Sequence, residues 1–390
     1  MNRNVLVSLV SAQTVPNIVF INEFKDKFSI DYFIFLTTKQ MEEDKQKRSD
    51  AIITTCKLDE NTCERLIVNQ EDFQDVIGKL RKAYRGNDKY YFNLTGGTKI
   101  MSLGAYEFAR NINQTERLFY IPNNRNHATN IETNNLSEIQ YRLNVQEYFS
   151  AYNVKIKNIN NLTGAIDCAK KRKDYTYKLW ECFNENADLF NETSDDIRKY
   201  WNSDKVKNNE KKIDLNELID AGEYFFDRLG LDISSESKKR LKHWIKYLTG
   251  GWFEELIYFE AKKFLNLNDD YIKLGVEIEK GGGNELDVVL TYENRLYYFE
   301  CKTGLGGKER EVLKETFYKL SHLKSQESFG LGMNNILLAL DEKVLYDNNG
   351  ELKDTYKLAK DNFRLQFFGL KDFKEKRIDG IFKEIFRKGE

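Results

Sequence analysis

Apolar residues fill both faces of several short runs in the first hundred residues. These runs lie at 4–10 (NVLVSLV), at 31–38 (DYFIFLTT), around Leu66 and from Lys89 onwards (KYYFNL). Helical or charged stretches separate them, at 15–28, 39–49 and 71–84. Strands that are apolar on both faces and alternate with helices are typical of a parallel sheet with helices on both sides. The pattern predicts a Rossmann-like α/β domain at the N-terminus.

A different pattern begins near residue 250. Apolar residues recur at helical spacing in GGWFEELIYFEAKKFL, residues 250–265. LDVVL (286–290) and RLYYFECK (295–302) are predicted strands, and the polar turn between them predicts a hairpin. Two further elements are predicted, a core strand at 334–340 and an amphipathic closing helix at 371–390. The C-terminal part is therefore expected to be a second α/β domain.

The chain between these two parts is rich in Lys, Asn, Asp and aromatic residues. It is predicted to be helical, with an exposed connector at 202–212. Its basic run Lys170–Lys173 is typical of a solvated helix face, although such a run also suits a phosphate backbone. A basic helix is predicted over 308–324, where Lys308 and Arg310 directly follow the last hairpin strand. With 390 residues the chain has room for several domains, and the predicted division is 1–145, 146–235 and 236–390.

The composition argues against several classes of protein. The chain has 61 Lys and Arg against 62 Asp and Glu, so any surface for nucleic acid must be local. The five cysteines are odd in number and lack metal-ligand spacing, which argues against a disulfide framework and a zinc site. The three histidines lie away from any nucleophile motif, so no catalytic triad is expected. No apolar run suits a signal peptide or a membrane span, and we expect a cytoplasmic protein without a membrane partner.

The second predicted hairpin strand ends in Glu300, Cys301 and Lys302. Side chains two positions apart lie on the same face of a strand, so Glu300 and Lys302 are expected to be neighbours. Hairpin pairing brings Asp287 level with Glu300, and two such carboxylates repel each other unless a cation lies between them. Oxygen ligands suit Mg²⁺ or Mn²⁺, which would activate water and neutralise phosphate charge, while Lys302 would position the water or help to deprotonate it. These groups favour phosphodiester hydrolysis.

Two polar loops follow predicted strands of the N-terminal domain, at the sheet edge where such folds bind ligands. They are SAQTVPN (11–17) and TGGTK (95–99). Gly96 and Gly97 allow a ligand to approach the backbone closely, and the helix that begins near Thr98 presents free N–H groups to an anion. A phosphate-bearing ligand is expected, although a structural turn explains TGGTK equally well. Neither an NTPase P-loop nor a dinucleotide fingerprint is present.

The C-terminal pattern resembles the PD-(D/E)xK nuclease superfamily, in which an acid and an acid-x-lysine strand share a hairpin and a preceding helix often adds a glutamate. The resemblance implies the catalytic residues Asp287, Glu300, Lys302 and Glu254, of which Asp287, Glu300 and Glu254 would bind the metal. Glu255 and Glu285 are alternatives to Glu254, and a glutamate in this first helical turn also offsets the helix dipole. Leu286 stands where that superfamily often has proline before the acid.

Taken with the two N-terminal loops, this core resembles the CARF-domain ancillary nucleases of type III CRISPR defence. The resemblance implies a homodimer that binds a cyclic oligoadenylate and thereby activates a metal-dependent nuclease acting on DNA, RNA or both. Cyclic tetra-adenylate is favoured because its symmetry contains the two-fold axis of a dimer. The implied ligand contacts are Ser11, Gln13, Thr14, Thr95, Gly96, Gly97, Thr98 and Lys99. Two alternatives stay open: a nucleotide-sensing regulator that binds nucleic acid without cleaving it, and a restriction-type endonuclease that needs no activator.

Overall fold

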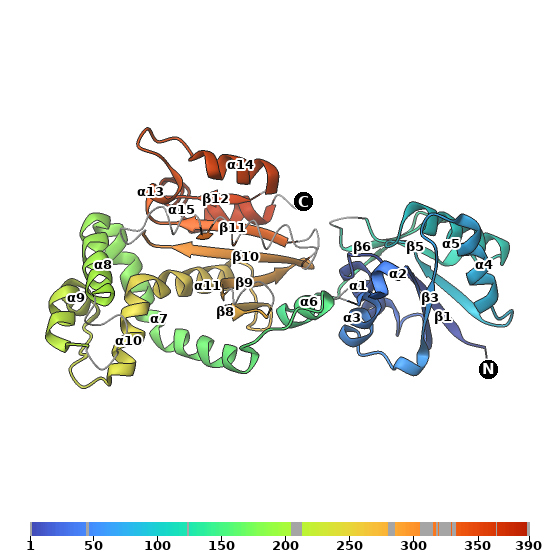
Figure 1. The fold of residues 1–390 in the computed structure, drawn as a ribbon, viewed down its shortest axis with the longest axis horizontal. Coiled ribbons are helices and arrows are strands. Elements are labelled where there is room, and N and C mark those ends of the chain that lie inside the picture. Colours follow the sequence, from blue (N-terminus) through green and yellow to red (C-terminus); the bar gives the residue numbers. More distant parts are fainter. Residues whose placement is uncertain are drawn as a thin grey trace.

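A computed structural model describes residues 2–43, 47–122, 125–203, 213–279, 285–304, 315–316, 319, 329, 333–363 and 365–387. The described residues form two lobes, and the short helix α6 (Val145–Ala151) lies between them (Figure 1). Most of the predicted helix over 308–324, with Lys308 and Arg310, lies outside the described residues, as does most of the connector at 202–212. In the part of the chain that the structure describes, no helix combines the length and the apolar character needed to cross a membrane.

The N-terminal lobe is built on a sheet of seven described strands in the order β3-β2-β1-β4-β5-β6-β7. The strands are β1 (Asn4–Leu9), β2 (Tyr32–Thr37), β3 (Cys63–Ile67), β4 (Lys89–Asn93), β5 (Leu118–Tyr120), β6 (His127–Asn130) and β7 (Leu136–Glu138). The pairs from β3 to β5 are parallel, which confirms the predicted Rossmann-like sheet. The strands β6 and β7 add an antiparallel edge that the pattern did not predict, because strands of three or four mixed residues leave no periodic signal.

Helices cover both faces of this sheet. They are α1 (Val15–Phe24), α2 (Lys39–Glu43), α3 (Arg48–Thr55), α4 (Phe73–Ala83) and α5 (Lys99–Asn111). Side chains of α1 and α3 pack in one apolar core, and side chains of α4 and α5 pack in the core on the other face. The charged helical stretch predicted over 39–49 contains α2, which ends at Glu43, and the start of α3 at Arg48.

The C-terminal lobe is built on a sheet of five described strands in the order β12-β11-β10-β9-β8. The strands are β8 (Ile272–Glu277), β9 (Glu285–Tyr292), β10 (Arg295–Lys302), β11 (Met333–Ala339) and β12 (Gln366–Phe368). The predicted hairpin is confirmed as β9 and β10, which pair antiparallel. Glu293 and Asn294 form its turn with φ values of 50° and 58°, the left-handed conformation that a tight two-residue turn requires.

Helices from the middle of the chain share a core with this second sheet. The described helices of the lobe are α7 (Leu162–Glu185), α8 (Ala187–Asn202), α9 (Leu215–Leu229), α10 (Lys238–Lys246), α11 (Trp252–Phe264), α13 (Glu342–Leu345), α14 (Asp354–Phe363) and α15 (Leu370–Arg387). Leu179, Phe190 and Phe225 from α7, α8 and α9 belong to the same buried cluster as Trp252 and Phe299. The division at residue 235 stays a prediction, and the shared core groups α7 to α9 with the C-terminal sheet.

The core that contains α1 and α3 continues into the C-terminal lobe and connects the two lobes. Ile18 of α1 and Tyr148 of α6 belong to one buried cluster together with Leu296, Tyr298 and Leu337 of the C-terminal sheet. The hydroxyl of Tyr148 donates to a backbone oxygen of the C-terminal lobe, that of Phe329, at 3.1 Å. The lobes are therefore packed against each other through α6.

Candidate active site and interdomain pocket

The β9–β10 hairpin brings the predicted acids together. Its register pairs Phe299 with Val288, so that Glu300 stands next to Asp287 at the following position. The backbone N–H of Cys301 donates to Oδ2 of Asp287 at 2.8 Å. Nζ of Lys302 lies 2.6 Å from Oε1 of Glu300, which places the two charges on the same face of the strand as predicted.

A second lysine completes this group. Nζ of Lys319 lies 2.6 Å from Oε2 of Glu300 and 3.7 Å from Oδ1 of Asp287. The hydroxyl of Tyr298 also donates to Glu300. We refer to Asp287, Glu300, Lys302 and Lys319 as the acid–lysine cluster. The sequence offered no signal for Lys319, which lies in a stretch where lysines recur every few residues.

The ionisation of the cluster follows from its burial and its charges. Burial and the nearby charge of Glu300 raise the pKa of Asp287 to about 6, although both lysines oppose the shift. Burial works against ionisation of Glu300 too, but Lys302 and Lys319 hold the pKa of this carboxyl below its usual value. Burial opposes protonation of Lys302, yet Glu300 and Asp287 raise its pKa. Lys302 is therefore a stable cation, suited to holding negative charge rather than to taking a proton from water.

The structure distinguishes between the three candidate glutamates. Glu255 is buried and accepts from Nε of Arg172 at 3.2 Å and from the Thr176 hydroxyl at 3.1 Å, so its carboxylate is already satisfied. Glu254 and Glu285 both line the cleft beside the cluster. Burial, followed by the charges of Asp287 and Glu285, raises the pKa of Glu254 well above its usual value. Glu254 is thus close enough to sense Asp287, as a shared ligand set requires.

A clamp from α8 fixes the two segments that carry Glu254 and Lys302. A π-helical turn (Tyr247–Gly251) joins α10 to α11. Nη2 of Arg198 donates to the backbone oxygen of Thr249 in this turn at 2.6 Å and to the hydroxyl of Thr303, next to Lys302, at 2.7 Å. Arg198 therefore positions the start of α11 against the end of β10, and sequence patterns gave no indication of this role.

A cleft of about 960 Å³ opens beside the cluster, between α7, α10, the π-helical turn and β8. Its basic lining residues are Lys171, Arg172, Arg240, His243 and Lys246, and its acidic ones are Glu236, Glu254, Glu255, Glu277 and Glu285. Within the described ranges neither Lys171 nor Lys246 has a carboxylate partner. The rest of the basic run is engaged internally, since Lys170 lies 2.7 Å from Asp269 and Lys173 lies over the Phe259 ring.

The donor atoms of the cluster fit a hard divalent cation. No group of three or more His, Cys, Asp or Glu side chains in the described ranges is preassembled to hold a metal ion. The lysines hold the oxygens of Glu300 instead. Carboxylate oxygens are nevertheless the donors that Mg²⁺ and Mn²⁺ prefer. Burial first, and the neighbouring carboxylates second, raise the pKa values of Asp287 and Glu254, and a bound cation would favour the ionised form of both.

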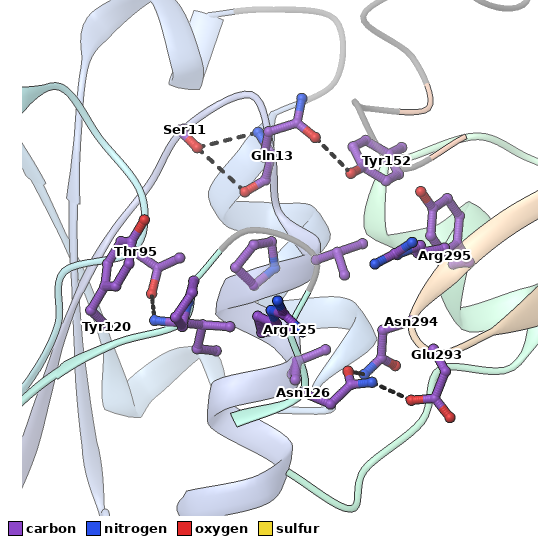
Figure 2. A pocket seen from close by; sticks show the side chains of 16 residues that line it. Ser11, Gln13, Thr95, Tyr120, Arg125, Asn126, Tyr152, Glu293, Asn294 and Arg295 are labelled. Carbon is purple, nitrogen blue, oxygen red and sulfur yellow. Dashed lines mark hydrogen bonds between the residues drawn. The ribbon is translucent and has the colours of Figure 1, made fainter. Parts of the chain in front are cut away.

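A second cavity, of about 240 Å³, lies where the two lobes meet (Figure 2). Its polar lining residues are Ser11, Gln13, Thr95, Tyr120, Arg125, Asn126, Tyr148, Tyr152, Glu293, Asn294 and Arg295. We call it the interdomain pocket. The predicted residues Ser11, Gln13 and Thr95 border it, and the hydroxyl of Tyr152 donates to Oε1 of Gln13 at 3.3 Å. Both predicted loops therefore meet at this pocket.

The other predicted loop residues support the loops rather than line the pocket. Thr14 is fully buried and its hydroxyl donates to the backbone oxygen of Ala151. A Cβ on Gly96 would stand 2.1 Å from the backbone oxygen of Leu9, so only glycine fits there. Gly97 has a φ of 73° and Thr98 caps α5. Lys99 is exposed in the first turn of α5 and does not line the pocket. Sequence reasoning missed the pocket residues from the C-terminal lobe, because no local pattern connects a hairpin turn to a distant loop.

Together, a Rossmann-like domain with a polar pocket and a hairpin domain with clustered acids and lysines define a ligand-binding module joined to a hydrolytic one. The family model of the Card1 CARF domain matches residues 5–148, and that of the Card1-like endonuclease domain matches residues 241–345. The chain belongs to the Card1-like nucleases with a CARF domain, which confirms the resemblance seen in the sequence.

Two solved structures are similar in fold over nearly the whole chain. Can2 from Sulfobacillus thermosulfidooxidans, in complex with cyclic tetra-adenylate, is 16% identical, with a TM-score of 0.62, and the match covers 94% of this chain and 95% of Can2. Protein VC1899 from Vibrio cholerae is 17% identical, with a TM-score of 0.69, and the match covers 99% of this chain and 98% of that protein. No curated protein matches the chain. At these identities the likeness supports the fold.

Proposed function

We propose that this protein is a metal-dependent endonuclease of type III CRISPR defence, activated by a cyclic oligoadenylate that binds to its CARF domain. The observation that carries the proposal is the convergence of Asp287, Glu300 and Lys302 on one hairpin inside the matched endonuclease domain. A regulator that only binds nucleic acid has no need for all three groups. The substrate is DNA, RNA or both, since the cluster acts on the phosphodiester that they share.

The residues of the cluster have separate tasks in this reaction. Asp287, Glu300 and Glu254 would hold Mg²⁺ or Mn²⁺. Such an ion would neutralise negative charge on the phosphate and lower the pKa of a bound water. Lys302 keeps its proton and stabilises the negative charge that develops on the phosphate. Lys319 contacts Glu300 from the other side and holds its carboxylate in place.

The cleft provides a surface for the substrate backbone. Its α7 and α10 wall presents Lys171, His243 and Lys246, whereas Glu254 and Glu285 lie where a cation is expected. A phosphate backbone is attracted to the basic wall and repelled by the acidic one. This polarity holds the backbone on the basic wall, and a cation bound by the acids would attract the scissile phosphate toward the cluster.

The activator is proposed to be cyclic tetra-adenylate, bound by a homodimer. A cavity of about 240 Å³ is smaller than the roughly 300–1,000 Å³ of a pocket that encloses a drug-sized ligand. One protomer therefore accommodates only part of such a ring, and a two-fold symmetric ligand can occupy equivalent pockets of two protomers. The shared fold with Can2, which was solved with this ring, supports the choice.

Cleavage by a Lys302→Ala variant tests the catalytic assignment. Removing a group that stabilises transition-state charge is expected to reduce the cleavage rate by about 100- to 1,000-fold. The measurement is the cleavage of plasmid, single-stranded DNA and single-stranded RNA with Mn²⁺ and activator, and with EDTA in a parallel series. Lys239→Ala, an exposed lysine of α10 outside the cleft lining, serves as the matched control. Wild-type rates in Lys302→Ala, or cleavage that persists in EDTA, would refute the site.

A further inference from the structure

The interdomain pocket receives one of its walls from the endonuclease lobe. Ser11 and Thr95 come from the strand ends of the CARF domain. Glu293 and Asn294 form the turn of the β9–β10 hairpin, and Arg295 is the first residue of β10. Figure 2 shows Arg295 on the side of the pocket opposite Thr95. The same hairpin carries Asp287 and Glu300 at its other end. One element therefore borders both the ligand pocket and the catalytic cluster.

The turn is fastened to the CARF side of the pocket. Nδ2 of Asn294 donates to the backbone oxygen of Tyr141 at 3.0 Å, and its Oδ1 accepts from the backbone N–H of Leu143 at 2.9 Å. Glu293 pairs with Nη2 of Arg142 at 2.8 Å. These contacts hold the turn at a fixed position, so a ligand that moves one side of the pocket also acts on the hairpin.

The hairpin is stiff enough to transmit such a movement. Its two strands pair continuously from the turn to Phe299 and Val288, and Leu296 and Tyr298 are completely buried. Arg295 and Lys302 are the first and last residues of β10, about 23 Å apart at the usual rise per residue of a strand. A shift at the turn therefore moves the cluster end as well, because a packed sheet does not deform freely.

The pocket has the chemistry of a site for a phosphate-bearing nucleotide. Arg125 comes from the CARF domain and Arg295 from the hairpin. A guanidinium group can donate two parallel hydrogen bonds to the oxygens of one phosphate. The carboxylate of Glu293 is already neutralised by Arg142. Tyr120, which is 42% exposed, offers an aromatic face to a base.

We propose that Arg295 is a ligand-binding residue supplied by the endonuclease domain, and that the β9–β10 hairpin couples the bound ring directly to the acid–lysine cluster. This inference rests on the proposed function and adds the route of activation to it. Two sites on one stiff element influence each other when a ligand favours one position of that element. The CARF domain alone would then form an incomplete site.

Two variants of the full chain separate binding from coupling. Arg295→Ala removes the proposed phosphate contact and is expected to bind cyclic tetra-adenylate about 10- to 100-fold more weakly, with Arg295→Lys in between. Asn294→Gly keeps the left-handed turn but removes the side-chain bonds to Tyr141, Leu143 and Asn126. It is expected to bind the ring, while cleavage at saturating ring falls by about 5- to 100-fold. Arg81→Ala, an exposed arginine on α4, is the control.

Calorimetry with cyclic tetra-adenylate and cleavage assays at saturating ring give the two readouts. Wild-type affinity in Arg295→Ala overturns the contact, and wild-type maximal cleavage in Asn294→Gly overturns the coupling. Failure of the wild-type protein itself to bind the ring would refute the proposed function instead. Binding and activation of the wild type, with both variants unchanged, would refute only the role of the hairpin.

Discussion

Asp287 is a buried acid whose charge is costly in the folded protein. Its usual pKa of 3.8 rises to about 6, so between these values the folded chain binds a proton that the unfolded chain has lost. Stability then decreases as the pH rises through this window, by on the order of 3 kcal/mol for a shift of two units.

An Asp287→Asn variant reveals this penalty, because it cannot titrate. In EDTA, we expect the melting temperature of the wild type to fall relative to that of Asp287→Asn as the pH rises from 4 to 7. Thermal melts at closely spaced pH values measure the difference. Parallel curves for the two proteins would show that Asp287 ionises freely, contrary to its burial beside Glu300.

Gly96 lies where the fold leaves no room for a side chain. A Cβ there would stand 2.1 Å from the oxygen of Leu9, which lies in the backbone and cannot move aside. Gly96→Ala is expected to cost about 2–3 kcal/mol of folding free energy. Gly86→Ala is the matched control, because a Cβ there meets nothing within 4 Å, and its stability should stay within about 0.5 kcal/mol of wild type. Equal denaturation midpoints for both variants would contradict the tight approach.

Contacts within one hairpin were predictable at the residue scale, and contacts across the fold were not. The alternation of a strand predicts that Glu300 meets Lys302, and antiparallel pairing predicts that it meets Asp287. Lys319 reaches the same carboxylate from a segment without a comparable pattern. The choice of Glu254 over Glu255 likewise depends on Arg172, which lies 83 positions away in the sequence.

Among the helices, α10 offers a test of whether the cleft binds nucleic acid. Lys246 lines the cleft and Lys239, on the same helix, does not. Lys246→Ala is expected to weaken binding of nucleic acid and to reduce its salt dependence by about one counterion, whereas Lys239→Ala leaves both unchanged. Anisotropy of a labelled oligonucleotide, measured in EDTA at several salt concentrations, decides this. Equal slopes for both variants would remove α10 from the substrate surface.

Elements with a strong period were predictable, and short or mixed ones were not. The apolar runs of β1, β2 and β4 and the β9–β10 hairpin were confirmed because their patterns are local. The antiparallel edge of β6 and β7 was missed, since its strands are short and polar. The packing of α7 to α9 on the second sheet depends on tertiary contacts that composition does not contain.

At the scale of the molecule, the two lobes share a core through α6 and share the interdomain pocket. The lobes are thus coupled by packed side chains rather than by a free linker. Such an arrangement suits allosteric control, because a change in how they meet affects both the pocket and the hairpin. The sequence was interpreted as separate domains, and therefore the pocket residues from the C-terminal lobe were not predicted.

The proposed function is tested most directly by whether a cyclic oligoadenylate activates cleavage by the wild-type protein. Wild-type protein with Mn²⁺ or Mg²⁺ is incubated with supercoiled plasmid, single-stranded DNA and single-stranded RNA, each with cyclic tri-, tetra- or hexa-adenylate or without a ring. We expect cleavage that requires metal and rises sharply with cyclic tetra-adenylate. Cleavage that is equally fast without any ring would contradict the proposed control by the CARF domain, and no cleavage under any condition would contradict the nuclease itself.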